Sequence, residues 1–565
     1  MSLYAVAAAA LETAEGGPHP QNASEIILAL PVETASPVFD DLIPAPPTPA
    51  PVAISEEDAR PLQASVDIPT PAAVTFTQGD VLRGAIMDRL ANDTAMRELR
   101  LNAKDREALT AFYTAAAQPT LWSRDGAFLP AAQGVAAILR DAGNDGLDPA
   151  DYPLPSLSLA KDAPPAAWAE ADLKLSVAAI RYARDARGGR IDPARLSNLI
   201  APTLDLPAIE AILSALVSTP DAGVALADFN PPHEGYRALK AKLAQLRENN
   251  VPRPVVHVPK GPTLRLGMRD PRVPLIRARF NLGPSSGDET AYDHTVVSAV
   301  SAFQKEKGLP TSGDLTAQTV AALDPGTSAA RLEGDLIANM ERWRWLPRDL
   351  GTRHIFVNVP EYRLRFVQDK DVIHETRVIV GKKESQTPIF SDEMKYLVVN
   401  PSWTVPPSIM KKEFLPALAS DPTYAARKGY KVIRNGNRIS VQQPPGERNA
   451  LGYVKFMFPN QYAVYLHDTP NRKLFSAQDR AFSHGCVRVD QPFQLAQEVL
   501  ESQGWNEQKL RGLIGKGERY IHLREPLPVH LTYFTLSSDE TGEMKTFEDL
   551  YGLNRKVRAA LGLDG

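Results

Sequence analysis

The chain has 565 residues, more than one hydrophobic core normally organises, so two to four domains are expected. A composition that is 43% hydrophobic and 23% charged excludes a wholly disordered or fibrous protein. Because 63 basic side chains nearly balance 67 acidic ones, the formal charge is only −4, and we expect no nucleic-acid partner held by counterion release.

Two further features are excluded by counting. No apolar stretch reaches the roughly 18 to 20 residues that a membrane-spanning helix requires, so we expect no internal membrane span. Cys486 is the only cysteine, which excludes an intramolecular disulfide and a zinc site built from several thiolates. A lone thiol is either an inert buried residue or a reactive group, and its neighbours must decide between the two.

Residues 1–80 are predicted to form a flexible, semi-extended tether. They are rich in proline and alanine, with prolines crowded into residues 44–51, and they lack hydrophobic periodicity. The alanine-rich residues 5–11 resemble the end of a signal peptide, but no basic segment precedes them. A disordered terminus and a truncated export signal both stay open, and the sequence indicates no oligomeric state.

Residues 81–250 are predicted to form a helical scaffold domain. Apolar residues recur at helical spacing in segments 109–113, 135–140 and 173–183, and glycines and prolines separate these segments. No residue pattern in this region indicates chemistry of its own.

A compact module is predicted over residues 261–325, after a proline-containing linker at residues 251–254. Apolar residues and a glutamine lie at helical spacing in it: Val296, Val297, Ala299, Val300, Phe303 and Gln304. A glycine-bounded turn and a second helical segment follow. This pattern resembles the three-helix peptidoglycan-binding module of many cell-wall enzymes, and a plain helical hairpin is the alternative.

The remaining sequence is predicted to contain a helical connector, residues 326–351, and an antiparallel β-sandwich-like domain, residues 352–535. Short β-branched segments with alternating polarity, bounded by polar turns, indicate the strands. A helical insertion at about residues 403–430 interrupts the strand rhythm and is a candidate lid. Residues 536–565 are expected to be a C-terminal tail or helix, so the fold class is multidomain α+β.

A histidine, the lone thiol, a glycine and an arginine lie close together in the predicted β-domain. An imidazole that takes the thiol proton of Cys486 makes a stronger nucleophile for acyl transfer, and both His467 and His484 are candidates by spacing. Gly485 permits a sharp backbone path, so its amide and that of Cys486 are candidate oxyanion donors. Arg488 either binds a substrate carboxylate or pairs with an acidic neighbour.

These residues resemble the signature of the YkuD-type L,D-transpeptidase catalytic domain. The resemblance rests on His467 followed by Ser483-His484-Gly485-Cys486-Val487-Arg488-Val489, and it extends over about 180 residues, including residues 400–406 and 528–533. Residues 340–347 resemble those of the large multidomain branch of that family, which carries a helical scaffold and a lid insertion.

The resemblance implies a role for each matching position. Cys486 would be the acyl acceptor, His467 the general base and acid, and the backbone carbonyl of Asp468 would orient the imidazole. Many relatives have glycine where this chain has Asp468, so that contact is the least secure. Ser483, His484 and Gly485 would line the site, Arg488 would contact substrate, and Tyr465 and Trp403 would wall the groove or act as core aromatics.

The implied reaction releases D-alanine from a peptidoglycan stem peptide through a thioester and passes the acyl group to an acceptor stem. The partners would be donor and acceptor stem peptides, no cofactor or metal is needed, and a periplasmic or cell-envelope location is implied. Carbapenem β-lactams would acylate the same thiol. The alternatives are a carboxypeptidase, a transferase that anchors a lipoprotein, a non-catalytic wall-binding scaffold and an unrelated cysteine protease.

Overall fold

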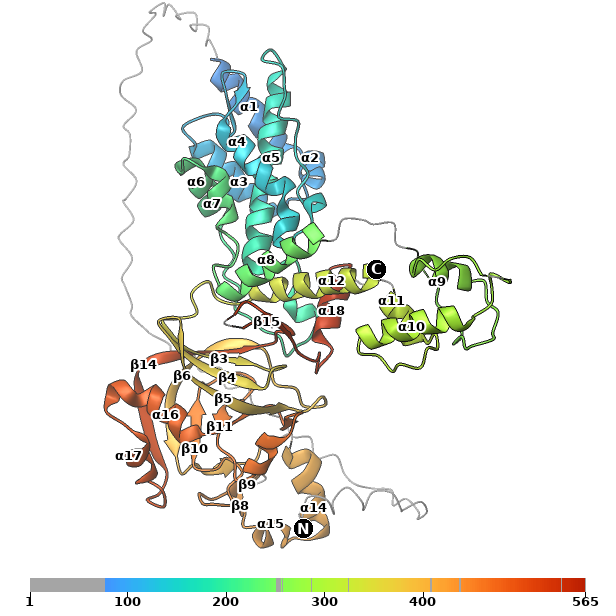
Figure 1. Cartoon of the computed structure of the whole chain (residues 1–565). Helices are drawn as coiled ribbons and strands as arrows, with labels where there is room; N and C mark the ends of the chain where they lie inside the picture. The colour runs from blue at the N-terminus through green and yellow to red at the C-terminus, as the bar shows by residue number, and fades with distance from the viewer. Residues whose placement is uncertain are drawn as a thin grey trace, which may run out of the picture. The chain divides into compact units, whose positions relative to one another are not determined.

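The computed structural model describes residues 77–249, 256, 258–285, 287–323, 325–406, 409–435, 438–539 and 541–563. Except for residues 77–80, the predicted tether lies outside the described residues, as do the alanine-rich start and the linker at residues 251–254. Figure 1 shows a helical region, a small helical module and a β-domain along the chain.

The helical region begins with a capped helix, α1 (Gln78–Ala91). Thr77 caps it by accepting a hydrogen bond from the Asp80 amide, while the Asp80 carboxylate accepts one from the Thr77 amide. The other helices of the region are α2 (Asp93–Glu98), α3 (Ala103–Ala115), α4 (Pro130–Arg140), α5 (Pro165–Gly188), α6 (Ile209–Ser218), α7 (Ala222–Ala227) and α8 (Glu234–Asn249). A short hairpin, β1 (Ser123–Arg124) and β2 (Ala127–Phe128), lies between α3 and α4.

Helix α5 runs through the apolar core of this region and carries a buried polar group, Asp172. Its carboxylate accepts hydrogen bonds from the Tyr113 hydroxyl at 2.6 Å and the Trp122 amide at 2.9 Å. The Trp122 indole N–H donates to Ser176 one turn further along α5, at 2.7 Å. A buried carboxylate is tolerated where such donors satisfy it, so these bonds tie the segment around Trp122 to α5.

The small module has its own core and contains α9 (Val273–Arg279), α10 (His294–Glu306) and α11 (Ala317–Leu323). Gln304 of α10 is buried in it. Its side-chain amide donates to the Asp314 carbonyl at 2.8 Å, and its oxygen accepts from the Gly313 amide at 2.8 Å. The glutamine noted in the sequence pattern therefore holds the glycine turn against the helix.

The β-domain is built on a nine-stranded sheet of described residues with the order β12-β5-β13-β11-β10-β6-β14-β3-β4. Because β4 also pairs with β5, the sheet closes on itself. The strands are β3 (Arg353–Asn358), β4 (Arg363–Gln368), β5 (Asp371–Gly381), β6 (Phe390–Val399), β10 (Val454–Met457), β11 (Leu466–His467), β12 (Ala481–Ser483), β13 (Val487–Val489) and β14 (Arg519–Thr532). Most neighbours are antiparallel as predicted, whereas β11–β13, β12–β5 and β14–β3 are parallel.

The interior of this sheet is filled by an apolar core, to which residues outside the sheet also contribute. Alternate strand residues such as Ile355, Val357, Leu397 and Val399 are fully buried. Helix α16 (Pro492–Leu500) and the short α17 (Glu507–Arg511) add their apolar faces to the same core. Burial of the alternate positions on one face defines the strand register, because a one-residue slip would expose them.

The predicted insertion contains both helices and strands. After β7 (Trp403–Thr404) come a π-helical turn (Met410–Phe414), α14 (Leu415–Ser420), α15 (Tyr424–Arg427), β8 (Lys431–Asn435) and β9 (Arg438–Gln443). Strands β7, β9 and β8 form a separate three-stranded sheet. Their own small core includes Val405, Phe414 and Val441. The insertion thus extends beyond residue 430, because β8 and β9 pair with each other and β9 pairs with β7.

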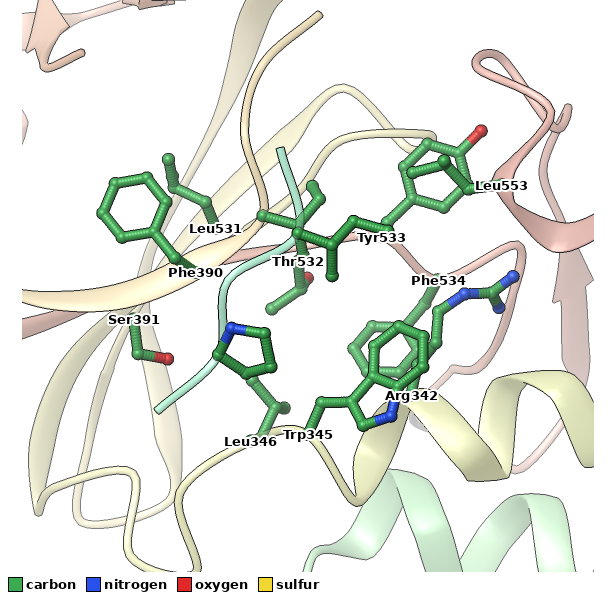
Figure 2. Close-up of a pocket in the computed structure, with 13 residues that line it drawn as sticks. Arg342, Trp345, Leu346, Phe390, Ser391, Leu531, Thr532, Tyr533, Phe534 and Leu553 are labelled. Atoms are coloured by element: carbon green, nitrogen blue, oxygen red, sulfur yellow. The ribbon is translucent and has the colours of Figure 1, made fainter. Parts of the chain in front are cut away.

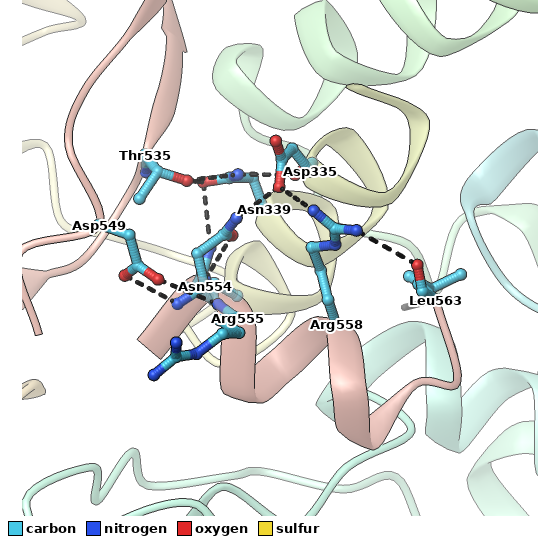
Figure 3. Close-up of polar contacts among 9 residues, drawn as sticks. Asp335, Asn339, Thr535, Asp549, Asn554, Arg555, Arg558 and Leu563 are labelled. Atoms are coloured by element: carbon cyan, nitrogen blue, oxygen red, sulfur yellow. Dashed lines mark hydrogen bonds and ion pairs between the residues drawn. The ribbon is translucent and has the colours of Figure 1, made fainter. Parts of the chain in front are cut away.

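Described residues after β14 make polar contacts with α12 (Pro325–Trp343), the helix of the predicted connector (Figure 3). Asn339 of α12 donates to the Thr535 hydroxyl and accepts from the Thr535 amide, at 3.0 and 2.9 Å. Asn554, in α18 (Leu553–Ala560), donates to Asp335 at 2.6 Å and accepts from Arg342 at 2.7 Å. A short hairpin, β15 (Leu536–Ser538) and β16 (Met544–Thr546), precedes α18.

Candidate active site

Cys486 and His467 lie on adjacent strands of the β-domain. In the parallel pair β11–β13, Leu466 is opposite Val487 and His467 is opposite Arg488. Continued by one residue, this register places Tyr465 beside Cys486. Side chains of paired residues point to the same face and alternate along a strand, so Tyr465, His467, Cys486 and Arg488 share one face of the sheet.

His467 is oriented by its own strand end. The carbonyl oxygen of Asp468 lies 2.5 Å from His467 Nδ1. A carbonyl only accepts, so Nδ1 carries the proton and Nε2 keeps a lone pair that can take a proton from a thiol. Burial lowers the pKa of His467 to about 3, and the positive charges of Arg488 and Lys455 contribute to this shift while the Asp468 bond opposes it. The imidazole is therefore neutral in the free protein.

Cys486 is partly buried and holds its proton at neutral pH. Burial raises the pKa of the Cys486 thiol, while hydrogen bonding from the Tyr465 backbone and the charges of Lys455 and Arg488 lower it. Burial also raises the pKa of Tyr465, Cys486 raises it further, and the Trp403 side chain lowers it. The Cys486 and Trp403 side chains therefore both interact with the Tyr465 hydroxyl. The ring centroids of Tyr465 and His467 lie 5.7 Å apart.

The backbone on the N-terminal side of the thiol is held in a tight turn by Ser483. Its hydroxyl donates to the Cys486 carbonyl at 2.5 Å and accepts from the Gly485 amide at 3.1 Å. Gly485 has φ = 119°, a conformation that side chains strongly disfavour. Because the Gly485 amide is used inside the turn, of the two predicted oxyanion donors only the Cys486 amide is not engaged by Ser483.

A buried chain of hydrogen bonds, which no sequence pattern indicated, supports this turn from behind. The Thr387 hydroxyl donates to the Gly485 carbonyl at 2.8 Å and accepts from the Gly381 amide at 2.9 Å. Tyr551, from the C-terminal segment, accepts from the Thr387 amide at 3.2 Å and donates to the Gly381 carbonyl at 2.6 Å. The Tyr551 amide in turn donates to Tyr533 at 2.7 Å. A local pattern does not link Thr387 or Gly381 to a thiol so distant in the sequence.

Asp468 has two separate tasks. Its backbone carbonyl contacts the imidazole, whereas its buried carboxylate accepts from the Tyr453 amide at 2.9 Å and from Arg472 at 2.8 Å. A side chain at Gly452 would collide with that carboxylate, because a Cβ atom at this position would lie 2.4 Å from it. Asp468 stands where many relatives have glycine, and its side chain leaves the contact between the Asp468 carbonyl and His467 in place.

The other predicted residues are distributed around the thiol. His484 is exposed, whereas His467 is buried, so the two imidazoles that spacing alone could not rank differ in environment. Trp403 is partly buried and lies 6.3 Å from Tyr430 of the insertion, centroid to centroid. Arg488 is partly buried next to His467.

Lys455 is a further site residue, one that the sequence did not indicate. It lies on β10 directly opposite His467, on the side of β11 away from β13. Its ammonium group lies 4.2 Å from the centroid of the Tyr465 ring. Alternation in residues 454–457 signals that Lys455 faces away from the buried side, but only the pairing of β10 with β11 brings it to the thiol.

An apolar pocket elsewhere does not belong to this site. It lies between residues 200–202, the end of α12 and the strands around Phe390 and Leu531 (Figure 2). Neither Cys486 nor His467 lines it. Several lining residues, among them Ile200 and Trp345, are part of the apolar core, so we interpret it as a gap where α12 packs on the sheet.

Neither a metal centre nor a membrane-spanning helix is found in the described structure. Within the described ranges, no group of three or more His, Cys, Asp or Glu residues is arranged to hold a metal ion. In the same part of the chain, no helix is both long enough and apolar enough to cross a membrane.

Comparison with family models gives three matches. Residues 107–243 match a scaffold domain, residues 275–323 a "Putative peptidoglycan binding domain", and residues 352–511 the L,D-transpeptidase catalytic domain named YkuD. The chain is thus of a multidomain class, in which a helical region, a small helical module and a β-rich domain carry separate family matches. Residues 352–511 belong to the L,D-transpeptidase catalytic domain family.

A curated relative from Haemophilus influenzae, named "Putative L,D-transpeptidase", is 35% identical over 263 residues. The match covers 43% of this chain and 53% of the relative, so it spans about half of that protein's length. A solved L,D-transpeptidase structure from Xylanimonas cellulosilytica is 18% identical, with 48% of this chain and 99% of the other covered, at a TM-score of 0.15. A solved structure of an Enterococcus faecium L,D-transpeptidase mutant is 12% identical, with 51% of this chain and 99% of the other covered, at a TM-score of 0.16. The family assignment rests on the sequence matches.

Proposed function

We propose that this protein is an L,D-transpeptidase that crosslinks peptidoglycan, with Cys486 as nucleophile and His467 as base. One observation carries the proposal: the lone thiol and a buried, oriented imidazole share a sheet face within the matched catalytic domain. The peptidoglycan-binding module supports the same substrate and a place in the cell envelope.

The first half-reaction acylates the enzyme. The Cys486 thiol gives its proton to His467 Nε2 as sulfur attacks the carbonyl that links the third and fourth residues of a donor stem peptide. The Cys486 amide, which Ser483 does not engage, would donate to the resulting oxyanion. When the C–N bond breaks, His467 returns the proton to the leaving amine, so D-alanine departs and a thioester remains.

The second half-reaction consumes the thioester. An acceptor amine attacks the thioester carbonyl and gives up a proton to His467, the C–S bond breaks, and sulfur regains a proton. If the amine belongs to another stem peptide, a crosslink forms. Water in its place would give a carboxypeptidase, and a lipoprotein lysine would give an anchoring transferase.

The pKa shifts explain why the free enzyme would not be acylated indiscriminately. Both partners are neutral at rest, because burial raises the pKa of Cys486 and lowers that of His467. Proton transfer would therefore accompany attack on a bound substrate, in contrast to a preformed thiolate–imidazolium pair that any electrophile could meet.

The test uses the full chain, a muropeptide with a tetrapeptide stem, and mass spectrometry. Wild-type protein is expected to release D-alanine and to gain the mass of the muropeptide less that of D-alanine, which is the sugar-bearing tripeptide acyl group, and a carbapenem should give a stable adduct. Because the chain has one cysteine, the site of each adduct is unambiguous. Cys486→Ala should lose adduct and product while retaining binding to isolated cell walls.

A matched control is Ser476→Ala, an exposed position whose hydroxyl donates to the nearby Lys473 carbonyl. It should behave as wild type. Crosslinking that persists in Cys486→Ala would reject the proposal. The masses of dimers, tripeptides and lysine conjugates distinguish the three acceptors.

A further inference from the structure

Lys455 has a position that a structural role alone does not explain. It lies in the middle of the nine-stranded sheet, yet its side chain is only half-buried and shares the face that carries His467. The residues before and after it, Val454 and Phe456, are fully buried on the opposite face. A long aliphatic or polar residue would satisfy the fold equally well, so the positive charge needs a separate reason.

The charge of Lys455 is not neutralised by the protein. Among the residues that the structure describes, no carboxylate forms an ion pair with its ammonium group, which lies against the face of the Tyr465 ring. The charge of Glu518 raises the pKa of Lys455, but the Glu518 carboxylate accepts hydrogen bonds from the Ser402 amide and hydroxyl, at 2.9 and 3.3 Å. A partly desolvated ammonium without an ion pair is costly, and an incoming anion would relieve that cost.

The other charged groups around His467 also favour the binding of an anion near Lys455. His467 is flanked on one side by Lys455 of β10 and on the other by Arg488 of β13. The acidic residue next to it, Asp468, directs its carboxylate to the Tyr453 amide and Arg472. The face around the thiol therefore carries two cations, while the phenol, thiol and imidazole on it are neutral.

We propose that Lys455 binds the terminal carboxylate of the donor peptide and so selects donors that end in a free acid. The inference rests on the proposed function. In such a donor the carboxylate belongs to the leaving residue and is separated from the scissile nitrogen by a single carbon. A group bound there is positioned relative to the carbonyl that Cys486 attacks.

The dimensions of the sheet are compatible with this binding mode. Neighbouring strands lie about 4.8 Å apart, and Cys486 lies two residues from Arg488, which is level with Lys455, so the backbones at Lys455 and Cys486 are separated by about 12 Å. A lysine side chain spans much of that distance, and Tyr465, between them, holds the ammonium by a cation–π contact. A bound carboxylate would also offset the two cations that lower the pKa of His467, and would make it a better base.

The experiment compares two tetrapeptide donors that differ only in a C-terminal carboxylate or carboxamide. Wild-type enzyme should prefer the acid by about 10- to 100-fold in kcat/KM, as expected for a hydrogen bond between charged groups. Lys455→Met should reduce this preference to a few-fold, because it should slow turnover of the acid more than turnover of the amide. Lys455→Arg should retain most of it. Dividing the acid-to-amide preference of the wild type by that of the variant cancels the intrinsic difference in reactivity between the two leaving groups.

Each outcome has a defined meaning. The carboxylate site is rejected if wild type accepts both donors equally. It is also rejected if Lys455→Met slows both donors by the same factor, because that result would mean that Lys455 stabilises the thiolate. Lys455→Gln repeats the test if the methionine variant does not fold. Absence of turnover of either donor by wild type would reject the proposed function itself, whatever the variants do.

Discussion

The helical region and the catalytic domain each bury ionisable groups, and two aspartates of the first contrast with two histidines of the second. In the helical region, burial raises the pKa of Asp172 and of Asp185 to about 6. In the catalytic domain, burial lowers the pKa of His530 to about 4 and that of His467 to about 3. In both cases the neutral form is favoured because burial penalises charge. One physical effect thus gives these aspartates and histidines opposite responses to acid, and of the four only His467 adjoins the thiol.

The comparison also separates stability from chemistry. In the helical region the buried polar groups are satisfied by donors of the same region, such as Tyr113 and Trp122 around Asp172. In the catalytic domain the imidazole of His467 is bonded through Nδ1, which leaves Nε2 for a reaction. Substitutions in the first region should therefore change unfolding, and those in the second should change turnover.

The largest expected effect is on turnover. His467→Ala should lower the acylation rate about 10²- to 10⁴-fold, the usual contribution of a general base, because no other buried imidazole adjoins the thiol in the described structure. Acyl-enzyme formation followed by mass spectrometry measures it. His484→Ala is the matched comparison, and an equal loss there would exchange the roles of the two histidines.

The second effect is on stability alone. Trp122→Ala should destabilise the helical region by about 3–5 kcal/mol, because a fully buried indole and its hydrogen bond to Ser176 are removed. Chemical denaturation measures the loss, and activity per folded molecule should stay within about twofold of wild type. A parallel loss of acylation by folded protein would show that the regions are coupled and would break the comparison.

The pH response sharpens the comparison with opposite signs. His530 has a pKa of about 4 when folded and 6.5 ordinarily, so the unfolded chain binds its proton more tightly and stability falls as the pH drops from about 6.5 to 4. Asp172 has a pKa of about 6 when folded and 3.8 ordinarily, so folding strengthens proton binding and stability rises as the pH drops from about 6 to 4. Each effect is limited to about 3 kcal/mol.

Amide hydrogen exchange, resolved by region and corrected for its intrinsic pH dependence, measures both responses. Peptides from β14 should lose protection in acid, whereas peptides from α5 should gain it. Asp172→Asn should remove the gain in α5 and leave β14 unchanged. Changes of the same sign in both regions would contradict the assigned protonation states.

The smallest expected effect comes from the support behind the thiol. Thr387→Val removes the bond to the Gly485 carbonyl and should lower kcat about tenfold with little change in KM, because the turn, and not substrate binding, is altered. Thr387→Ser keeps the hydroxyl and should restore most of the rate. If Thr387→Val raises KM and leaves kcat unchanged, Thr387 does not position the nucleophile.

The sequence by itself determined the order of helical and strand-rich regions, the small module and the candidate nucleophile. Strand segments such as residues 354–359 were recognisable because burial on one face imposes alternation on the sequence. Cys486 was recognisable as the single thiol within a histidine- and glycine-containing motif, and His467 was one of two candidate bases that only the family resemblance ranked; the family match covers that segment. Gln304 was visible in the same way, as part of a local helix-and-turn pattern.

Only the tertiary structure decided which residues surround the thiol. Lys455 comes from β10, Thr387 from the segment after β5 and Tyr551 from the C-terminal segment; none is near Cys486 in the sequence. Sequence alone also left open the ranking of His467 over His484, which differ in burial, and it did not predict that the Gly485 amide bonds to Ser483. The physical reason is that strand pairing and buried hydrogen bonds join distant segments, and local patterns contain no information on their register.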